Sequence, residues 1–193
     1  MTPTANSSPS AAVWDAWEAD GRSYYVINDT ELMQFTRNFP VRSGGIAVDV
    51  GCGNGAFSRQ LHRFGYDVTG FDFASTALHA ARRTPLPGVR YLHHDLNKGD
   101  PPGLPRHGID LVVCRLVLPF LNEPTAWIRR VRDLWLRPGG QMYVVIPVIE
   151  GDTTQPGGMT EREIANLTPG WSHSVRYDVR GRVAFLALRS AAT

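Results

Sequence analysis

A glycine-rich turn between residues 48 and 56 constrains the fold of this chain more than any other feature. The segment Ile46–Val50 is a short apolar run typical of a buried strand, and the apolar spacing from Ala56 to Phe64 predicts an amphipathic helix. Glycines at the junction permit positive φ angles and let the backbone approach a ligand closely. The first N–H groups of the helix have no partner within it, so they point at that ligand. The turn therefore predicts a small-molecule site, most often one for a nucleotide-like cofactor.

Asp49 narrows the kind of cofactor. The pattern Gly51-x-Gly53-x-x-Ala56 satisfies the dinucleotide-binding fingerprint, whose last position tolerates alanine, but that fingerprint alone is weak. A carboxylate two residues before the first glycine is unfavourable beside a pyrophosphate and favourable beside an ammonium or sulfonium group. With Asp49, Gly51, Gly53 and Gly55, the chain resembles the class I S-adenosylmethionine-dependent methyltransferases, whose first motif has the form D-x-G-x-G.

A second acid closes the next predicted strand, which covers residues 67–73. Asp72 lies 21 residues after Gly51, where a carboxylate can accept both ribose hydroxyls in methyltransferases and NAD enzymes alike. The alternative is that Asp72 caps the helix predicted over 75–83. Ser75 is itself a good cap and would leave Asp72 free. Phe73, directly after this acid, joins it in the predicted cofactor-binding set.

The resemblance continues in the expected order to about residue 148. Residues 89–96 are a third predicted strand, and the resemblance implies that Asp95 meets the adenine amino group while Leu96 packs on the ring. Residues 109–114 and 141–148 are predicted strands four and five. The L-R-P-G-G turn at 136–140, common in small class I methyltransferases, precedes strand five.

Alternating strands and helices from Ile46 onward predict an α/β fold with a mostly parallel sheet. A helix is predicted over 124–136, and Thr160-x-x-Glu163 is a capping box for a short helix. Residues 175–179 and 183–188, joined by a turn at 180–181, predict a closing hairpin. The expected architecture is a single-domain, Rossmann-like methyltransferase fold: a seven-stranded sheet with a C-terminal antiparallel hairpin and helices on both faces.

Three segments follow from this organisation: a disordered tail over 1–10, an N-terminal helical lid over 11–44, and the S-adenosylmethionine-binding domain over 45–193. One lid helix contains Trp14 and Trp17, and a second begins near Asp29. Residues 14–21 resemble the opening of the thiopurine, halide/thiol and tellurite methyltransferases. That resemblance implies that the two tryptophans close over the methionine end of the cofactor. The alternative is that they are core aromatics that anchor the helix to the sheet.

Methyl transfer from a sulfonium is an in-line displacement, so the protein mainly supplies proximity and a water-poor site. Many small methyltransferases carry a histidine after the fourth strand, whereas this chain has residues 115–120 as R-L-V-L-P-F. Tyr24 could orient a substrate hydroxyl from the lid, and His173 could face the pocket from the start of the sixth strand. Arg115 could clamp a carboxylate of the cofactor or the substrate, or form a salt bridge with Asp49 or another acid. No His, Asp or Glu cluster has metal-ligand spacing, so no metal is expected.

The composition agrees with a small-molecule enzyme. The chain has 193 residues and a formal charge of +2, without a basic run, which argues against nucleic acid as a partner. It has no apolar run of membrane-spanning length and no signal-peptide core, so we expect a cytoplasmic protein without a membrane partner.

The predicted function is methyl transfer from S-adenosylmethionine to an O, N or S nucleophile of a small molecule, with an acidic metabolite as one candidate. The predicted setting is bacterial specialised metabolism or detoxification, and the protein is expected to be a monomer or homodimer. One alternative is an NAD(P)-dependent oxidoreductase, which would need an acid such as a Tyr-x-x-x-Lys pair, although Lys98 is the only lysine. The other alternative is a catalytically silent cofactor-binding module.

Overall fold

The computed structural model describes residues 10–20, 26–40, 43–150, 157–179 and 182–192. They belong to two compact units, an amino-terminal one over Pro9–Gly103 and a carboxy-terminal one that contains Leu104–Thr193. The strands form a seven-stranded sheet in the order β3-β2-β1-β4-β5-β7-β6. This order, with its parallel pairs and its antiparallel strands at one end, confirms the predicted α/β architecture.

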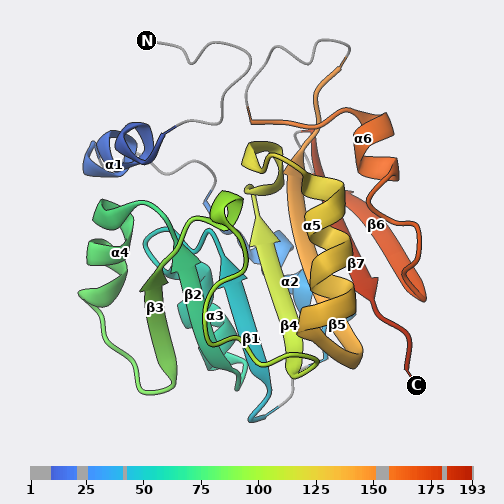
Figure 1. Cartoon of the computed structure of the whole chain (residues 1–193), viewed down its shortest axis with the longest axis horizontal. Helices are drawn as coiled ribbons and strands as arrows, with labels where there is room; N and C mark the ends of the chain where they lie inside the picture. The colour runs from blue at the N-terminus through green and yellow to red at the C-terminus, as the bar shows by residue number, and fades with distance from the viewer. Residues whose placement is uncertain (1–9, 21–25, 41–42, 151–156, 180–181, 193) are drawn as a thin grey trace. The chain divides into compact units, whose positions relative to one another are not determined.

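Three parallel strands make the amino-terminal part of the sheet (Figure 1): β1 (Ile46–Val50), β2 (Asp67–Asp72) and β3 (Val89–His93). β1 and β2 are buried beyond their first residues, as expected for parallel strands covered on both faces. β3 ends earlier than predicted, because after two further residues the chain enters a short 3-10 helix, η1 (Leu96–Lys98).

Each of the two helices between these strands buries one face. In α3 (Ala56–Arg63) the buried residues are Phe57, Ser58 and Leu61. In α4 (Ser75–Arg82) they are Ala77, Leu78 and Ala81. Both sets follow the spacing of an amphipathic helix, so the sequence periodicity predicted these helices correctly.

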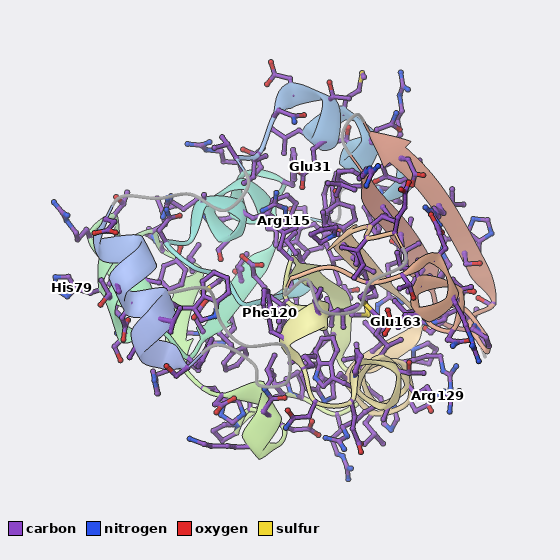
Figure 2. The ribbon with its side chains drawn as sticks, turned by 90° about the horizontal axis from the view of Figure 1, so that it is seen from above. Glu31, His79, Arg115, Phe120, Arg129 and Glu163 are labelled. Carbon is purple, nitrogen blue, oxygen red and sulfur yellow. The ribbon has the colours of Figure 1, made fainter. Side chains whose placement is uncertain are left out.

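Two further helices precede β1, namely α1 (Ala11–Ala19) and α2 (Asp29–Asn38). The start of α2 at Asp29 confirms the prediction, and the side chain of Asn28 caps it by accepting the N–H of Glu31 at 2.9 Å. Phe35 of α2 lies edge-on to Phe57 of α3, with ring centroids 5.4 Å apart, so aromatic packing holds α2 on α3. The side chain of Glu31 is also fully buried (Figure 2).

The carboxy-terminal unit pairs β4 (Ile109–Arg115) in parallel with β5 (Leu136–Pro147). β7 (Val183–Arg189) is antiparallel to both β5 and β6 (His173–Val179), which confirms the predicted hairpin. The helical segments are η2 (Leu118–Phe120), α5 (Pro124–Arg130), the π-helical η3 (Val131–Trp135) and α6 (Glu161–Ala165).

Two predicted boundaries in this unit were wrong. The helix expected over 124–136 is α-helical only to Arg130 and continues as a π-helical turn. The L-R-P-G-G segment does not precede β5 but is an irregular part of it: Leu136 pairs with Ile109 and Gln141 pairs with Leu111, so the ladder skips four residues of β5. An ion pair between Arg137 in this bulge and Asp110 of β4 holds the bulge in place.

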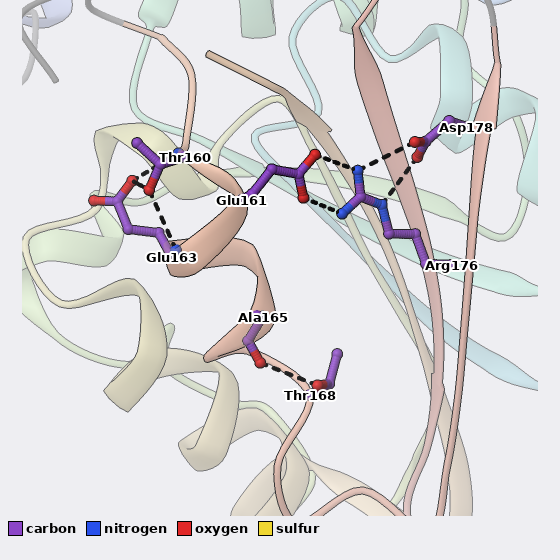
Figure 3. Close-up of polar contacts among 7 residues, drawn as sticks. All are labelled: Thr160, Glu161, Glu163, Ala165, Thr168, Arg176 and Asp178. Carbon is purple, nitrogen blue, oxygen red and sulfur yellow. Dashed lines mark hydrogen bonds and ion pairs between the residues drawn. The ribbon is translucent and has the colours of Figure 1, made fainter. Parts of the chain in front are cut away.

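The predicted capping box of α6 is confirmed (Figure 3). The N–H of Glu163 donates to the hydroxyl of Thr160 at 3.3 Å, and the Glu163 carboxylate accepts the N–H of Thr160 at 2.7 Å. Arg176 of β6 pairs with both Glu161 and Asp178, which ties α6 to the edge strand. None of the helices in the described residues combines the length and the apolar character that a membrane span requires.

Candidate cofactor site

The glycine turn has the backbone geometry that its sequence predicted. Gly51, Gly53 and Gly55 have φ angles of 64°, 53° and 77°, in the left-handed region that only glycine adopts without strain. A Cβ atom on Gly55 would lie 2.3 Å from the hydroxyl oxygen of Tyr91, whereas one on Gly53 would meet no atom within 4 Å. Gly55 therefore packs against the protein, and Gly53 borders open space that can receive a ligand.

Tyr91 packs against the glycine turn at Gly55, and the sequence analysis did not predict this role. It is buried with Cys52, Leu78 and Ala81 in one cluster, and its hydroxyl lies 3.4 Å from the carbonyl oxygen of Gly55. Burial, and then the negative charges of Asp49 and Asp72, raise the pKa of the Cys52 thiol well above its usual range. Cys52 is therefore a protonated packing residue and not a nucleophile.

Asp49 is buried at the end of β1, with 2% of its surface exposed. Its Oδ2 atom accepts a hydrogen bond of 2.6 Å from the hydroxyl of Ser58, which lies on α3 and is itself fully buried. The carboxylate therefore ties the strand before the turn to the helix after it. Sequence reasoning missed Ser58; the available signal was a hydroxyl on the apolar face of the predicted helix.

Asp72 joins the end of β2 to the glycine turn. Its Oδ2 atom accepts the N–H of Gly53, and its Oδ1 atom accepts the N–H of Ala74, both at 2.8 Å. The N-cap of α4 is Ala74, so the expectation that Ser75 caps this helix and leaves Asp72 free was wrong. Burial raises the pKa of Asp72, although the N–H groups of Ala74, Gly53 and Phe73 oppose that shift. A carboxylate has about four acceptor sites, so Asp72 can still accept from a ligand hydroxyl.

The other predicted adenosine contacts lie beside this acid, at the carboxyl ends of the same strands. Asp95 follows β3 and caps η1: its Oδ1 atom accepts the N–H of Asn97 at 3.0 Å, and its Oδ2 atom lies 3.6 Å from the Lys98 ammonium. Phe73 and Leu96 are half-buried. Asp72 pairs in register with His93, so the ends of β2 and β3 are level.

The predicted lid residues are described in part. Trp14 lies half-buried on α1, the backbone of Trp17 lies in the same helix, and the side chain of Trp17 and all of Tyr24 fall outside the described residues. Asp15, between the two tryptophans, accepts the N–H of Thr76 at 2.7 Å. This bond joins α1 to the first turn of α4, and no signal in the sequence predicted it.

Arg115 ends β4, as predicted, and is half-buried (Figure 2). Leu116 follows with a φ angle of 62°, an uncommon conformation for a residue with a branched side chain, and its N–H donates to the carbonyl of Val145 at 2.8 Å. Strain of this kind concentrates at functional sites and costs roughly 1–3 kcal/mol. It marks the end of β4 as a constrained position.

The structure does not bring His173 to Arg115. Through the paired strands, Arg115 is level with Val145 of β5, Phe185 of β7 and Tyr177 of β6. His173 lies four residues before Tyr177, roughly 13 Å along the strand, and is exposed. A role for His173 in facing the pocket from the start of the sixth strand stays a prediction. In the described part of the chain, no group of three or more His, Cys, Asp or Glu residues could hold a metal ion.

Comparison with known proteins identifies the family. Residues 48–144 match the model described as "Methyltransferase domain". A ubiquinone biosynthesis O-methyltransferase of Xanthomonas euvesicatoria pv. vesicatoria is 30% identical over 131 residues, which cover 66% of this chain and 54% of the relative. The chain thus spans a little over half the length of such relatives.

Solved structures show the same fold. The [4+2]-cyclase SpnF superimposes with a TM-score of 0.77 at 18% identity, over 100% of this chain and 99% of that one. Phosphoethanolamine N-methyltransferase 2 of Haemonchus contortus, in complex with S-adenosyl-L-methionine, gives 0.75 at 15% identity, over 94% of this chain and 57% of that one. The chain belongs to the methyltransferase-domain family, as its resemblance to the class I S-adenosylmethionine-dependent methyltransferases predicted.

Proposed function

We propose that this chain binds S-adenosylmethionine at the carboxyl ends of β1, β2 and β3 and transfers its methyl group to a small molecule. The observation that carries this proposal is Asp72. Its carboxylate accepts one N–H from the glycine turn and one from the start of α4, and it keeps acceptor capacity for a ligand. A pair of neighbouring hydroxyls, as on ribose, matches that arrangement.

The remaining contacts complete the cofactor assignment. Asp95 is proposed to meet the adenine amino group, with Phe73 and Leu96 against the ring. Gly51 and Gly53, backed by Asp49, are proposed to carry the methionine end. The cofactor supplies an activated methyl group, so the protein's own residues need only orient it and exclude water.

The proposed lid is residues 11–44, and the proposed methyl-transfer domain is residues 45–193. Trp14 and Trp17 contribute to water exclusion in this proposal. Tyr24 stays a candidate for orienting the acceptor, although it lies outside the described residues. A cytoplasmic location, a monomer or homodimer, and the absence of a nucleic-acid partner stay predictions.

Oxygen is the acceptor atom that the comparisons favour among O, N and S. The curated relatives are named O-methyltransferases of ubiquinone biosynthesis, which supports a biosynthetic role more than detoxification or specialised metabolism. The substrate itself is a proposal, since those relatives are longer than this chain. An acidic methyl acceptor stays a candidate, because the guanidinium of Arg115 at the end of β4 could bind its carboxylate with two hydrogen bonds.

A catalytically silent or re-purposed module is the second candidate, and one observation favours it. SpnF has the same fold over its whole length and is named a [4+2]-cyclase, so this fold does not by itself determine the reaction. The oxidoreductase alternative is dropped, because the methyltransferase model covers the glycine turn that suggested it.

Two measurements test the proposal. Calorimetry should show that S-adenosylhomocysteine binds and that NADH does not; the reverse result would end the cofactor assignment. Methyl-labelled S-adenosylmethionine should then be incubated with matched phenols, amines and thiols, with Asp72→Ala as the control variant. Label on the phenols supports an O-methyltransferase. Binding without transfer to any of the three classes would favour the silent module.

A further inference from the structure

The first turn of α4 is capped by a residue from another helix. Its N-cap, Ala74, has the extended backbone of a cap (φ −85°, ψ 110°) but no side-chain oxygen. The N–H of Thr76, in the position that an N-cap side chain usually serves, donates instead to Oδ1 of Asp15 at 2.7 Å. Asp15 lies on α1, 61 positions earlier in the chain. One hydrogen bond therefore caps α4 and fixes α1 at the same time.

This bond lies beside the proposed ribose site. Asp72 binds the N–H of Ala74 through Oδ1, and Asp15 binds the N–H two residues later. The negative charge of Asp15 also raises the pKa of Asp72, so the two carboxylates are within electrostatic range of each other. Figure 1 shows α1 beside the start of α4, at the end of the unit toward which β1, β2 and β3 run. α1 is therefore anchored on the ribose side, whereas the resemblance placed it over the methionine end.

We propose that Asp15 is a latch that holds α1 at the ribose end of the cofactor site and slows cofactor release. This inference rests on the proposed S-adenosylmethionine site. Asp15 acts through α1 and Thr76, and not by touching the cofactor, so it is a positioning residue. The latch acts by keeping α1 at the ribose end of the site, and opening it releases α1 from that end. Whatever equilibrium affinity the closed latch adds, a bound cofactor favours the closed latch to the same extent, since coupling of binding free energies is reciprocal.

The dissociation rate of S-adenosylhomocysteine, measured by stopped-flow displacement, is the first test. Asp15→Ala should raise this rate about five- to tenfold, the factor that corresponds to losing an N-cap hydrogen bond. Asp15→Asn keeps the acceptor oxygen and removes the charge, so it should recover part of the loss. Glu123→Ala is the matched control, because it removes an exposed acid at the N-cap of α5 whose side chain makes no cap hydrogen bond, and it should leave the rate unchanged.

A double variant separates the latch from simple helix capping. Ala74→Ser supplies α4 with a cap of its own at a position that already has cap geometry. In Asp15→Ala combined with Ala74→Ser, hydrogen exchange of the Thr76 amide should slow again, while cofactor dissociation stays fast because α1 is still released. If the added cap also restores the slow dissociation, Asp15 is only a helix cap and the latch is refuted.

Hydrogen exchange of the cofactor-free protein keeps this test independent of the proposed function. Asp15→Ala should increase exchange at the Thr76 amide and throughout α1 in the absence of any ligand. Unchanged exchange would refute the latch and leave the cofactor site standing. If S-adenosylhomocysteine does not bind the wild-type protein at all, the proposed function fails, and with it the latch's effect on release. The exchange data would then still decide whether Asp15 joins the two helices.

Discussion

Replacing Ser58 by alanine tests whether the buried Asp49 carboxylate depends on a partner from α3. The hydroxyl of Ser58 donates to Oδ2 of Asp49 at 2.6 Å, and both side chains are almost completely excluded from water. A buried carboxylate that loses a donor loses part of the compensation for its desolvation. We therefore expect Ser58→Ala to lower the free energy of unfolding and to weaken cofactor binding, because Asp49 leads directly into the glycine turn.

The magnitude follows from two opposing effects. A hydrogen bond to a charged group contributes about 1.5–3 kcal/mol. Alanine has the higher helix propensity and returns about 0.5 kcal/mol in α3. The net loss in unfolding free energy is therefore about 1–2.5 kcal/mol, which corresponds to a fall in melting temperature of roughly 2–10 °C for a chain of this length.

The assay is urea unfolding of the wild-type protein and Ser58→Ala, together with the double-mutant cycle that adds Asp49→Asn. The cycle should give a coupling energy above about 0.5 kcal/mol, as expected for groups in direct contact. Ser75→Ala makes the same substitution at an exposed helical position and should stay within about 0.5 kcal/mol of the wild type. A Ser58→Ala protein as stable as the Ser75→Ala control would refute the reasoning.

Three further perturbations address the rest of the site. Burial raises the pKa of Asp72, and ribose hydroxyls donate best to its ionised form. The affinity for S-adenosylhomocysteine should therefore be constant at high pH and fall as the pH drops through that raised pKa. Calorimetry from pH 8 to pH 5 checks this, and an equally steep profile in Asp72→Asn would assign the effect to another group. Gly70→Ala should lower the unfolding free energy by about 1–3 kcal/mol through overpacking, because the new Cβ would lie 2.9 Å from both Cys52 Sγ and Tyr91 Cδ1. Thermal melts should show partial recovery when Cys52→Ala is added, and no recovery would mean that the thiol is not the obstacle. Arg115→Leu should raise the KM for a carboxylate-bearing acceptor more than for its methyl ester, and Arg115→Lys should recover only part of the loss, because lysine lacks the bidentate fork. A collapse of cofactor affinity in steady-state and binding assays would instead assign Arg115 to the cofactor.

The sequence predicted the parts of this fold that depend on local pattern. β1, the glycine turn and α3 follow one another within 18 residues, and their apolar spacing and glycines were sufficient to place them. The closing hairpin and the capping box of Thr160 and Glu163 were also local. Boundaries were less predictable, because the L-R-P-G-G segment reads locally as a turn, whereas pairing with β4 makes it a bulge.

Contacts between residues far apart in the chain could not be predicted from the sequence. Ser58 was not connected to Asp49 because the bond depends on how α3 lies against β1. Tyr91 was missed although two glycines, Gly55 and Gly70, leave room for it, because its ring occupies the space that a side chain at either position would need. The distance between His173 and Arg115 was not predictable either, because it depends on the register of β4, β5, β7 and β6.

Asp72 could be identified as a site residue from the sequence, but its hydrogen-bond partners could not, because they depend on the fold. Its place at the end of β2 was evident from the sequence, and so was the chemistry of a carboxylate beside a glycine turn. What the fold adds is that Gly53 and Ala74 already bind this carboxylate, so it orders the turn as well as offering acceptors to a ligand. A substitution that removes the charge should therefore change the turn and the ligand affinity together.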